Sequence, residues 1–146
     1  MAAPDKPSPD KLSIVVYAGD YGRVHYALAM AASAAAMARP ATLFFTMNAI
    51  RALTKSDGWR ALPAGDIAPG KSGGEQDSVM TAKGLAGFED LLEACVECKV
   101  KILVCDMGLQ ALGIAKSDLR DDVPYDEGGI VTFLADASPS GTTLFI

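Results

Sequence analysis

Short apolar runs separated by helical segments constrain the fold of this chain more than any other feature. Four runs have the aliphatic and β-branched composition of strands: residues 12–18, 41–46, 99–105 and 142–146. The segments between them predict helices: residues 23–38, 48–53, 87–98 and about 109–114. Strands that alternate with helices predict a mostly parallel sheet with helices on its faces. We therefore expect one doubly wound α/β domain.

Composition excludes several classes of function. The 146 residues suit a single domain, and 50% hydrophobic against 21% charged residues indicates a globular chain. A net charge of −5 without a basic stripe argues against nucleic-acid binding. The longest apolar run, residues 27–37, is too short to span a bilayer. Residues 1–10 are polar and proline-rich, which predicts a disordered tail and no signal peptide.

Two segments do not follow the alternation. Residues 54–74 are rich in glycine and proline and have few periodic apolar residues. We expect residues 54–80 to form a mobile lid or an interface insertion, in which Trp59, Leu62 and Met80 could cover a site or a subunit contact. The second segment, residues 130–137, has a pattern that fits either a strand or an amphipathic helix.

Cys105 ends the third apolar run and is the first candidate for chemistry. Asp106-Met107-Gly108 follows it and leads the chain into a short helix. Ligands collect at the carboxyl ends of strands in open α/β sheets, and a thiolate is favoured at the amino end of a helix. The alternative is a small, inert core residue, since buried free cysteines are common. Asp106 also opposes a thiolate beside it.

A second strand exit carries Gly19-Asp20-Tyr21-Gly22. This loop lacks both the dinucleotide-binding glycine pattern and the triphosphate-binding loop pattern. Asp20 is suited to cap the following helix, and His25 lies one turn into it, either facing the site or solvated. We expect Gly19, Asp20 and His25 to lie on the rim of the same edge as Cys105, together with Asp106, Met107 and Gly108.

The pair Cys95-Val96-Glu97-Cys98 has a C-x-x-C spacing but an unfavourable position. It lies at the end of a predicted helix, where the helix dipole does not favour a thiolate, and Cys95 falls on the apolar stripe. With a single His25 and no second such pair, we expect no metal site. Structural thiols are favoured, although Cys98 could approach Cys105 as a resolving thiol. An odd count of three cysteines, without a secretory signal, argues against a disulfide framework, and the lack of signal-peptide features at residues 1–10 indicates a cytoplasmic protein.

Several motifs in order resemble one known family over about residues 11–146. They are Ala18-Gly19-Asp20, Ala34-Ala35-Ala36-Met37, Leu43-Phe44-Phe45-Thr46, Val100 to Met107, Leu112-Gly113-Ile114, Gly128-Gly129 and Thr143-Leu144-Phe145-Ile146. The chain resembles the DsrE/DsrF-like family of small sulfur-relay proteins. It is most similar to the branch with Phe-Phe-Thr in its second strand and Leu-Phe-Ile at its end.

This resemblance implies a three-layer, flavodoxin-like (DsrEFH-like) fold with a mostly parallel central sheet of about five strands. It implies a homotrimer or hexamer and a sulfur carrier that uses no cofactor. Cys105 matches the relay cysteine, which accepts sulfane sulfur as a persulfide and passes it to a partner thiol. The partners would be sulfur donor and acceptor proteins or small persulfides, with no nucleic acid and no membrane span.

Two positions depart from the family pattern. Gly108-Leu109-Gln110 stands where a small polar residue, Met and often Asp are expected. Lys99 stands where glycine commonly closes a helix, so it would pay a penalty for left-handed backbone if that geometry is kept. Two other functions therefore stay open. One is a ligand-binding or assembly module with an inert Cys105, and the other is a thiol-disulfide redox protein that uses Cys98 with Cys105.

Overall fold

The computed structural model describes residues 10–146, so the tail expected at residues 1–10 lies almost wholly outside the described residues. The strands in this part are β1 (Leu12–Val16), β2 (Ala41–Phe45), β3 (Lys101–Cys105), β4 (Asp126–Gly128) and β5 (Thr142–Phe145). The α-helices are α1 (Tyr21–Ala36), α2 (Gly73–Ala82), α3 (Phe88–Glu97), α4 (Asp106–Leu112) and α5 (Ile130–Asp136). The 3-10 helices are η1 (Met47–Leu53), η2 (Gly58–Ala61) and η3 (Lys116–Asp118).

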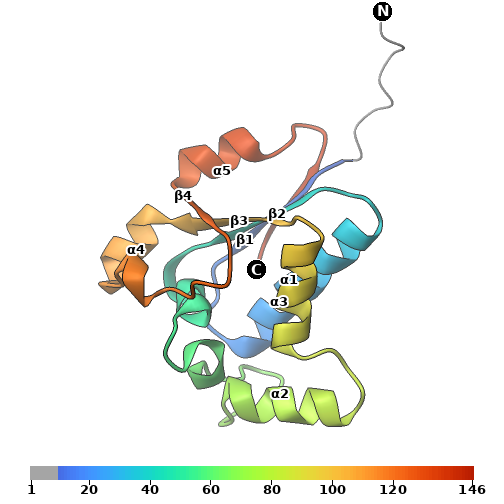
Figure 1. The fold of residues 1–146 in the computed structure, drawn as a ribbon, viewed down its shortest axis with the longest axis vertical. Coiled ribbons are helices and arrows are strands. Elements are labelled where there is room, and N and C mark those ends of the chain that lie inside the picture. The colour runs from blue at the N-terminus through green and yellow to red at the C-terminus, as the bar shows by residue number, and fades with distance from the viewer. Residues whose placement is uncertain (1–9) are drawn as a thin grey trace, which may run out of the picture.

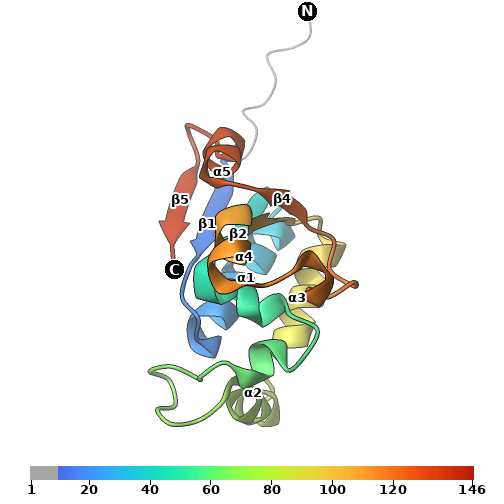
Figure 2. The ribbon, with the colours of Figure 1, turned by 90° about the vertical axis from the view of Figure 1, so that its left-hand side faces the viewer.

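The five strands form one parallel sheet in the order β4-β3-β2-β1-β5. This confirms the expected α/β class with a central sheet of five strands. Because all strands are parallel, their carboxyl ends lie at one edge of the sheet, and the segments that follow β1, β2 and β3 gather there. Figures 1 and 2 show α4 at this edge.

Helices cover both faces of the sheet. α1 and α3 lie together on one face, and α5 lies on the other (Figure 1). On the α5 face, Phe133 stacks on Phe44 with ring centroids 5.1 Å apart, and the Thr42 hydroxyl donates to Asp136. The segment at residues 130–137, for which the sequence left two options, is therefore a helix.

Small residues let α1 approach the sheet closely. Val24, Leu28 and three alanines of its inner face are buried: Ala27, Ala31 and Ala34. As expected, Asp20 caps the helix, since its carboxylate accepts a hydrogen bond from the Arg23 backbone N–H at 3.1 Å. No helix among the described residues is both long and apolar enough to cross a membrane.

The insertion at residues 54–80 is folded onto the body of the protein. Trp59 and Leu62 are buried in the core, and the Trp59 ring stacks on Phe88 at 4.7 Å. α2 begins at Ser72, whose hydroxyl accepts from the Glu75 N–H while the Glu75 carboxylate accepts from the Ser72 N–H. A buried tryptophan and a capped helix therefore order this segment, for which we expected a mobile lid or an interface insertion.

Candidate functional site

Cys105 lies at the carboxyl edge of the sheet, where the sequence predicted it. It is the last residue of β3 and occupies the N-cap position of α4. Side chains alternate along a strand, so Cys105 shares a face with Lys101, which contacts Asp136 of α5. The thiol therefore lies on the α5 side of the sheet. Its side chain is fully buried, with 0% of Cys105 exposed.

Gly128 brings the start of α5 close to Cys105. The two residues are partners across β3 and β4. A Cβ atom at Gly128 would lie 2.8 Å from the Cβ of Thr132, in the first turn of α5. Cys105 is therefore enclosed between the first turns of α4 and α5, and the Gly128-Gly129 motif is what permits this packing.

Gly108 brings η1 onto the same site. A Cβ atom at Gly108 would lie 2.6 Å from Cδ1 of Ile50, 2.8 Å from the backbone nitrogen of Met47 and 3.6 Å from the Cβ of Cys105. η1 thus packs against the first turn of α4, directly beside the thiol. This close approach is the physical reason for glycine at a position where the family pattern has a small polar residue.

On its other side, η1 packs closely against Gly19. A Cβ atom there would lie 2.5 Å from the Cβ of Asn48, so η1 is fixed between the exit of β1 and α4. Met47, the first residue of η1, has a φ of 48°, which is left-handed backbone at a residue other than glycine. Such a conformation costs on the order of 1 kcal/mol and needs surrounding contacts to persist. Strained backbone therefore lies next to the candidate thiol.

Asp20 and His25, two of the expected rim residues, have structural contacts. Asp20 caps α1, pairs with Arg23 at 2.8 Å and lies against Gly65. His25 is buried on α1, where its Nε2 lies 2.9 Å from the carbonyl oxygen of Ala86 and its ring packs on Tyr21. Since α1 covers the face opposite to the Cys105 side chain, the structure does not bring His25 and Cys105 together.

The exposed rim beside Cys105 is made by α4. Met107 is half exposed, and Asp106 is exposed as the first residue of the helix. Both follow the thiol directly in sequence, so they form its solvent side.

Cys95 and Cys98 lie away from Cys105. Cys95 is buried, its thiol donates to the carbonyl of Leu28 at 3.5 Å, and burial raises its pKa to about 12. Cys98 is exposed and precedes β3, whereas Cys105 ends it. A strand rises about 3.3 Å per residue, and a disulfide needs Cα atoms within about 7 Å. The structure therefore argues against Cys98 as a resolving thiol, because β3 holds the two residues at its opposite ends.

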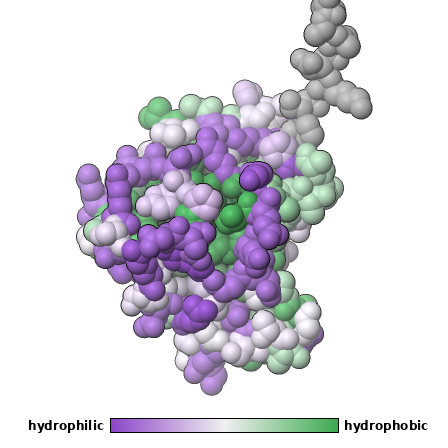
Figure 3. Space-filling view, viewed as in Figure 1, coloured by the Kyte–Doolittle hydropathy of each residue, from purple (hydrophilic) through white to green (hydrophobic). Residues whose placement is uncertain are grey.

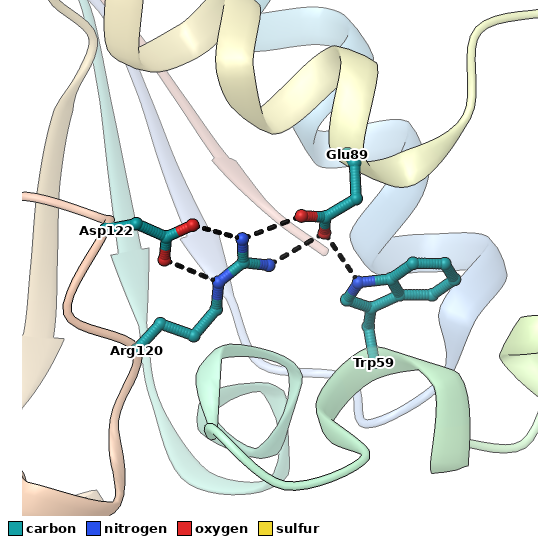
Figure 4. A network of polar contacts seen from close by, with 4 residues as sticks. All are labelled: Trp59, Glu89, Arg120 and Asp122. Carbon is teal, nitrogen blue, oxygen red and sulfur yellow. Dashed lines mark hydrogen bonds and ion pairs between the residues drawn. The ribbon is translucent and has the colours of Figure 1, made fainter.

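Sequence analysis missed a network of polar contacts that holds the loops at this edge (Figure 4). Arg120 donates to both carboxylate oxygens of Glu89 at 2.7 Å and to Asp122 at 2.7 and 2.9 Å. The Trp59 indole N–H donates to Glu89 at 2.8 Å. Hydrogen bonds from Arg120 lower the pKa of Glu89, and those to Asp122 and Glu89 raise the pKa of Arg120. The network joins η2, α3 and the loop before β4.

An open cavity of about 650 Å³ lies between the η1–η2 segment and η3. Its lining combines the cations Arg51 and Lys55 with the carboxylate of Asp118 and the hydroxyl of Ser117. Among the described residues, no group of three or more His, Cys, Asp or Glu side chains is placed to hold a metal ion.

The chain is similar to known proteins in sequence and in fold. The model of the DsrE/DsrF/DrsH-like family matches residues 71–145, about half of the chain. The chain is 28% identical to the uncharacterized protein YrkE of Bacillus subtilis (strain 168), covering 93% of this chain and 96% of that protein. It is 26% identical to the sulfur carrier protein DsrE2 of Allochromatium vinosum, covering 93% and 98%. The crystal structure of the ychN protein from E. coli has a TM-score of 0.56 at 17% identity, covering 94% of this chain and 99% of that one.

Proposed function

The chain belongs to the DsrE/DsrF/DrsH-like family, and from this we propose that it is a sulfur carrier that holds sulfane sulfur on Cys105. The observation that carries the proposal is the position of this cysteine. It ends β3 at the carboxyl edge of the sheet, in a chain similar to a sulfur carrier protein along almost its whole length. Other thiols are less suited, since Cys95 lies within α3, where burial raises its pKa, and Cys98 lies at the opposite edge.

The proposed reaction is two successive sulfur transfers. The Cys105 thiolate attacks the outer sulfur of a donor persulfide; a new S–S bond forms, and the donor S–S bond breaks. The donor leaves as a thiolate and takes up a proton. An acceptor thiolate then attacks the outer sulfur of the Cys105 persulfide, which restores the Cys105 thiol. Electrons balance over both steps, so the relay needs neither an oxidant nor a cofactor.

A buried thiol must become accessible for this reaction. Cys105 is fully buried, and η1 packs beside it through Gly108. We infer that η1 is the segment that moves, since its first residue, Met47, has left-handed backbone whose strain lowers the cost of opening. Local opening of a short segment requires less free energy than global unfolding. The relay would therefore proceed from a minor, open state.

Self-association and location complete the proposal. We propose a homo-oligomer, a trimer or hexamer, that exchanges sulfur with donor and acceptor proteins or small persulfides. A relay of this kind needs free thiols, and Cys95, Cys98 and Cys105 are all free. We propose that it works in the cytoplasm, where thiols are kept reduced.

The test is intact mass after incubation with a small persulfide donor. Because exposed Cys98 would itself take up sulfur, the experiment uses a Cys98→Ser variant as the reference. We expect the reference to gain the mass of one sulfur atom, which dithiothreitol removes. The matched variant, with Cys105→Ser added, should gain none. Equal loading of both proteins, or no loading of either one, would reject the carrier role of Cys105.

One observation favours a second function, a ligand-binding or assembly module in which Cys105 is inert. The thiol has no exposed surface in the single chain, as a structural core cysteine would have. In that case Cys105 takes up no sulfur at any donor concentration, and Cys105→Ser changes only stability. The same loading experiment separates the two functions.

A further inference from the structure

The cavity between the η1–η2 segment and η3 has no part in the sulfur transfer described so far. Its volume of about 650 Å³ is typical of small-molecule sites in proteins. η1 begins two residues after β2 ends, and ligands of open α/β sheets bind beyond the carboxyl ends of the strands. Figure 3 shows a largely hydrophilic face over η1 and η2, which are teal and green in Figure 1. A polar ligand suits this position.

The two cations of the cavity are little engaged by the protein itself. The Nε of Arg51 donates to Asn48 at 3.3 Å, and no carboxylate in residues 10–146 lies within ion-pair distance of Arg51. Lys55 pairs with Asp121 at 3.3 Å, and both of these side chains are largely exposed. Surface pairs of this kind are weak, so Lys55 can also bind a ligand. Such cations favour an anionic ligand, and Arg51 in particular suits a carboxylate.

The remaining lining indicates which kind of anion fits. The Asp118 carboxylate accepts a backbone N–H at 2.9 Å, which leaves the exposed Asp57 as the carboxylate that a ligand meets. Leu62 and Ile114 add an apolar wall. A ligand with carboxylates for the two cations and an ammonium group for Asp57 is complementary to this lining. An inorganic anion has no group that pairs with Asp57.

The course of η1 connects the cavity with Cys105. Arg51 belongs to the last part of η1, whereas Met47, its first residue, packs at Gly108 beside the thiol. A 3-10 helix rises about 2.0 Å per residue, so Arg51 lies about 8 Å from Met47 along the helix axis. An extended tripeptide spans about 10 Å. A ligand of that size, held by its carboxylates at one end of η1, therefore reaches the end where the thiol lies.

We propose that this cavity binds the sulfur donor, a small persulfide of about tripeptide size that carries carboxylates and an ammonium group. Arg51 and Lys55 bind the carboxylates, and Asp57 binds the ammonium group. When η1 opens, the outer sulfur of the bound donor meets the Cys105 thiolate; the new S–S bond forms, the donor S–S bond breaks, and the donor leaves as a thiolate that takes up a proton. The inference rests on the proposed carrier function and names its substrate class.

The first measurement is calorimetric binding of reduced glutathione, a tripeptide thiol with two carboxylates and one ammonium group. It uses the full chain with Cys98→Ser and Cys105→Ser, so that no sulfur transfer contributes to the heat. Adding Arg51→Met with Lys55→Met should raise the dissociation constant at least ~10-fold, because the ligand carboxylates lose both cations. Glutathione diethyl ester, in which both carboxylates are blocked, should bind the cavity with both cations in place at least ~10-fold more weakly than glutathione.

Lys71→Met with Lys83→Met is the matched control. It removes the same two positive charges at exposed lysines that do not line the cavity. The control pair should bind glutathione as tightly as the protein with all four cations. Circular dichroism of each variant confirms that the compared proteins are folded.

The second measurement is the rate of sulfur loading from glutathione persulfide, followed by intact mass in the Cys98→Ser background. Below saturation, the variant without Arg51 and Lys55 should load at least ~10-fold more slowly than the control pair. At saturating donor the two rates should be equal, because the substitutions weaken binding and leave the transfer itself unchanged. The persulfide of the diethyl ester should load both proteins at the same rate.

Four results overturn the proposal: no glutathione binding, equal binding after loss of Arg51 and Lys55, equal binding of the diethyl ester, or loss of binding in the control pair. Sulfur loading without glutathione binding keeps the carrier function and rejects this cavity as the donor site. Glutathione binding without loading of any protein rejects the carrier function and, with it, the donor role of the ligand. Failure of the cavity and failure of the carrier function are therefore distinguishable.

Discussion

Replacing Gly108 by Ala tests whether η1 is packed tightly against the candidate site. The new Cβ would lie 2.6 Å from Cδ1 of Ile50 and 2.8 Å from the backbone nitrogen of Met47. The Ile50 side chain can rotate away, but the backbone of Met47 moves only if η1 shifts. Overpacking of this kind costs about 2–3 kcal/mol, and the higher helix propensity of alanine returns about 1 kcal/mol. We expect a net loss of about 1–2 kcal/mol, or about 5 °C in melting temperature.

Urea unfolding measures this loss, and Gly129→Ala is the control. A Cβ atom at Gly129 would meet nothing within 4 Å, and its φ of −110° suits any residue. The control should therefore unfold within about 0.5 kcal/mol of the unchanged chain. If Gly108→Ala is as stable as the control, the space around Gly108 is not tight and the reasoning is refuted.

The same variant should expose the thiol. Strain between α4 and η1 raises the population of the open state, and 1.4 kcal/mol corresponds to a tenfold change. With Cys98 replaced by Ser, we expect native-state alkylation of Cys105 to become about tenfold faster in Gly108→Ala. An unchanged rate in a destabilised variant would show that η1 does not control access to the thiol.

Three further predictions follow from other contacts. Lys99→Gly should stabilise the chain by about 1 kcal/mol in urea unfolding, because Lys99 has a φ of 64° and glycine adopts this backbone without strain. Burial opposes ionisation of Asp136, but hydrogen bonds from Lys11, Thr42 and Lys101 outweigh it and lower the pKa of Asp136 to about 2 from 3.8. This stabilisation, up to about 2 kcal/mol, is complete above pH ~4 and is lost as the pH falls to ~2; Asp136→Asn should remove that acid-dependent loss. Arg120→Met should cost about 1–2 kcal/mol at low salt and less at high salt, with a shift in Trp59 fluorescence, because Glu89 loses its cation.

The strands that build the core could be predicted because each is a short run of apolar and β-branched residues. β4 could not, because Asp126-Glu127-Gly128 is a short edge strand held by backbone pairing, without an apolar face. α2 was missed for a related reason: of its residues, only Gly73 and Gln76 are buried, so it has no apolar stripe. Its start nevertheless had a signal, since Ser72 and Glu75 have the spacing of a capping box.

The position of Cys105 could be predicted, but its burial could not. A cysteine that ends an apolar strand must lie at the carboxyl edge of a parallel sheet. Its enclosure depends on close approaches at Gly19, Gly108 and Gly128, which join segments far apart in sequence. His25 is the opposite case, since its spacing from Tyr21 and Leu28 places all three on one helical stripe, and that stripe is buried. Helical phase would have assigned it to the core instead of the rim.

Lys99 has the left-handed backbone for which the sequence predicted an energetic penalty. Lys99 follows the end of α3 and has left-handed backbone, and Ala38 has the same conformation after α1, with a φ of 59°. Both helices therefore end in the way that glycine favours, with a different residue in each case. At these two helix ends the penalty lies far from Cys105, so there it bears on stability and not on the site.

The pairing of β5 with β1 has a consequence for how the chain reaches this fold during synthesis. Ile146 donates its backbone N–H to Val15 and accepts from Tyr17 and Ala18, so β5 and the residue after it complete the outer edge of β1. At a typical 5–20 residues per second, β1 waits on the order of 10 s for that partner. During that interval its free edge could pair with another nascent chain. Slower synthesis would therefore lengthen the period in which this protein is open to misassembly.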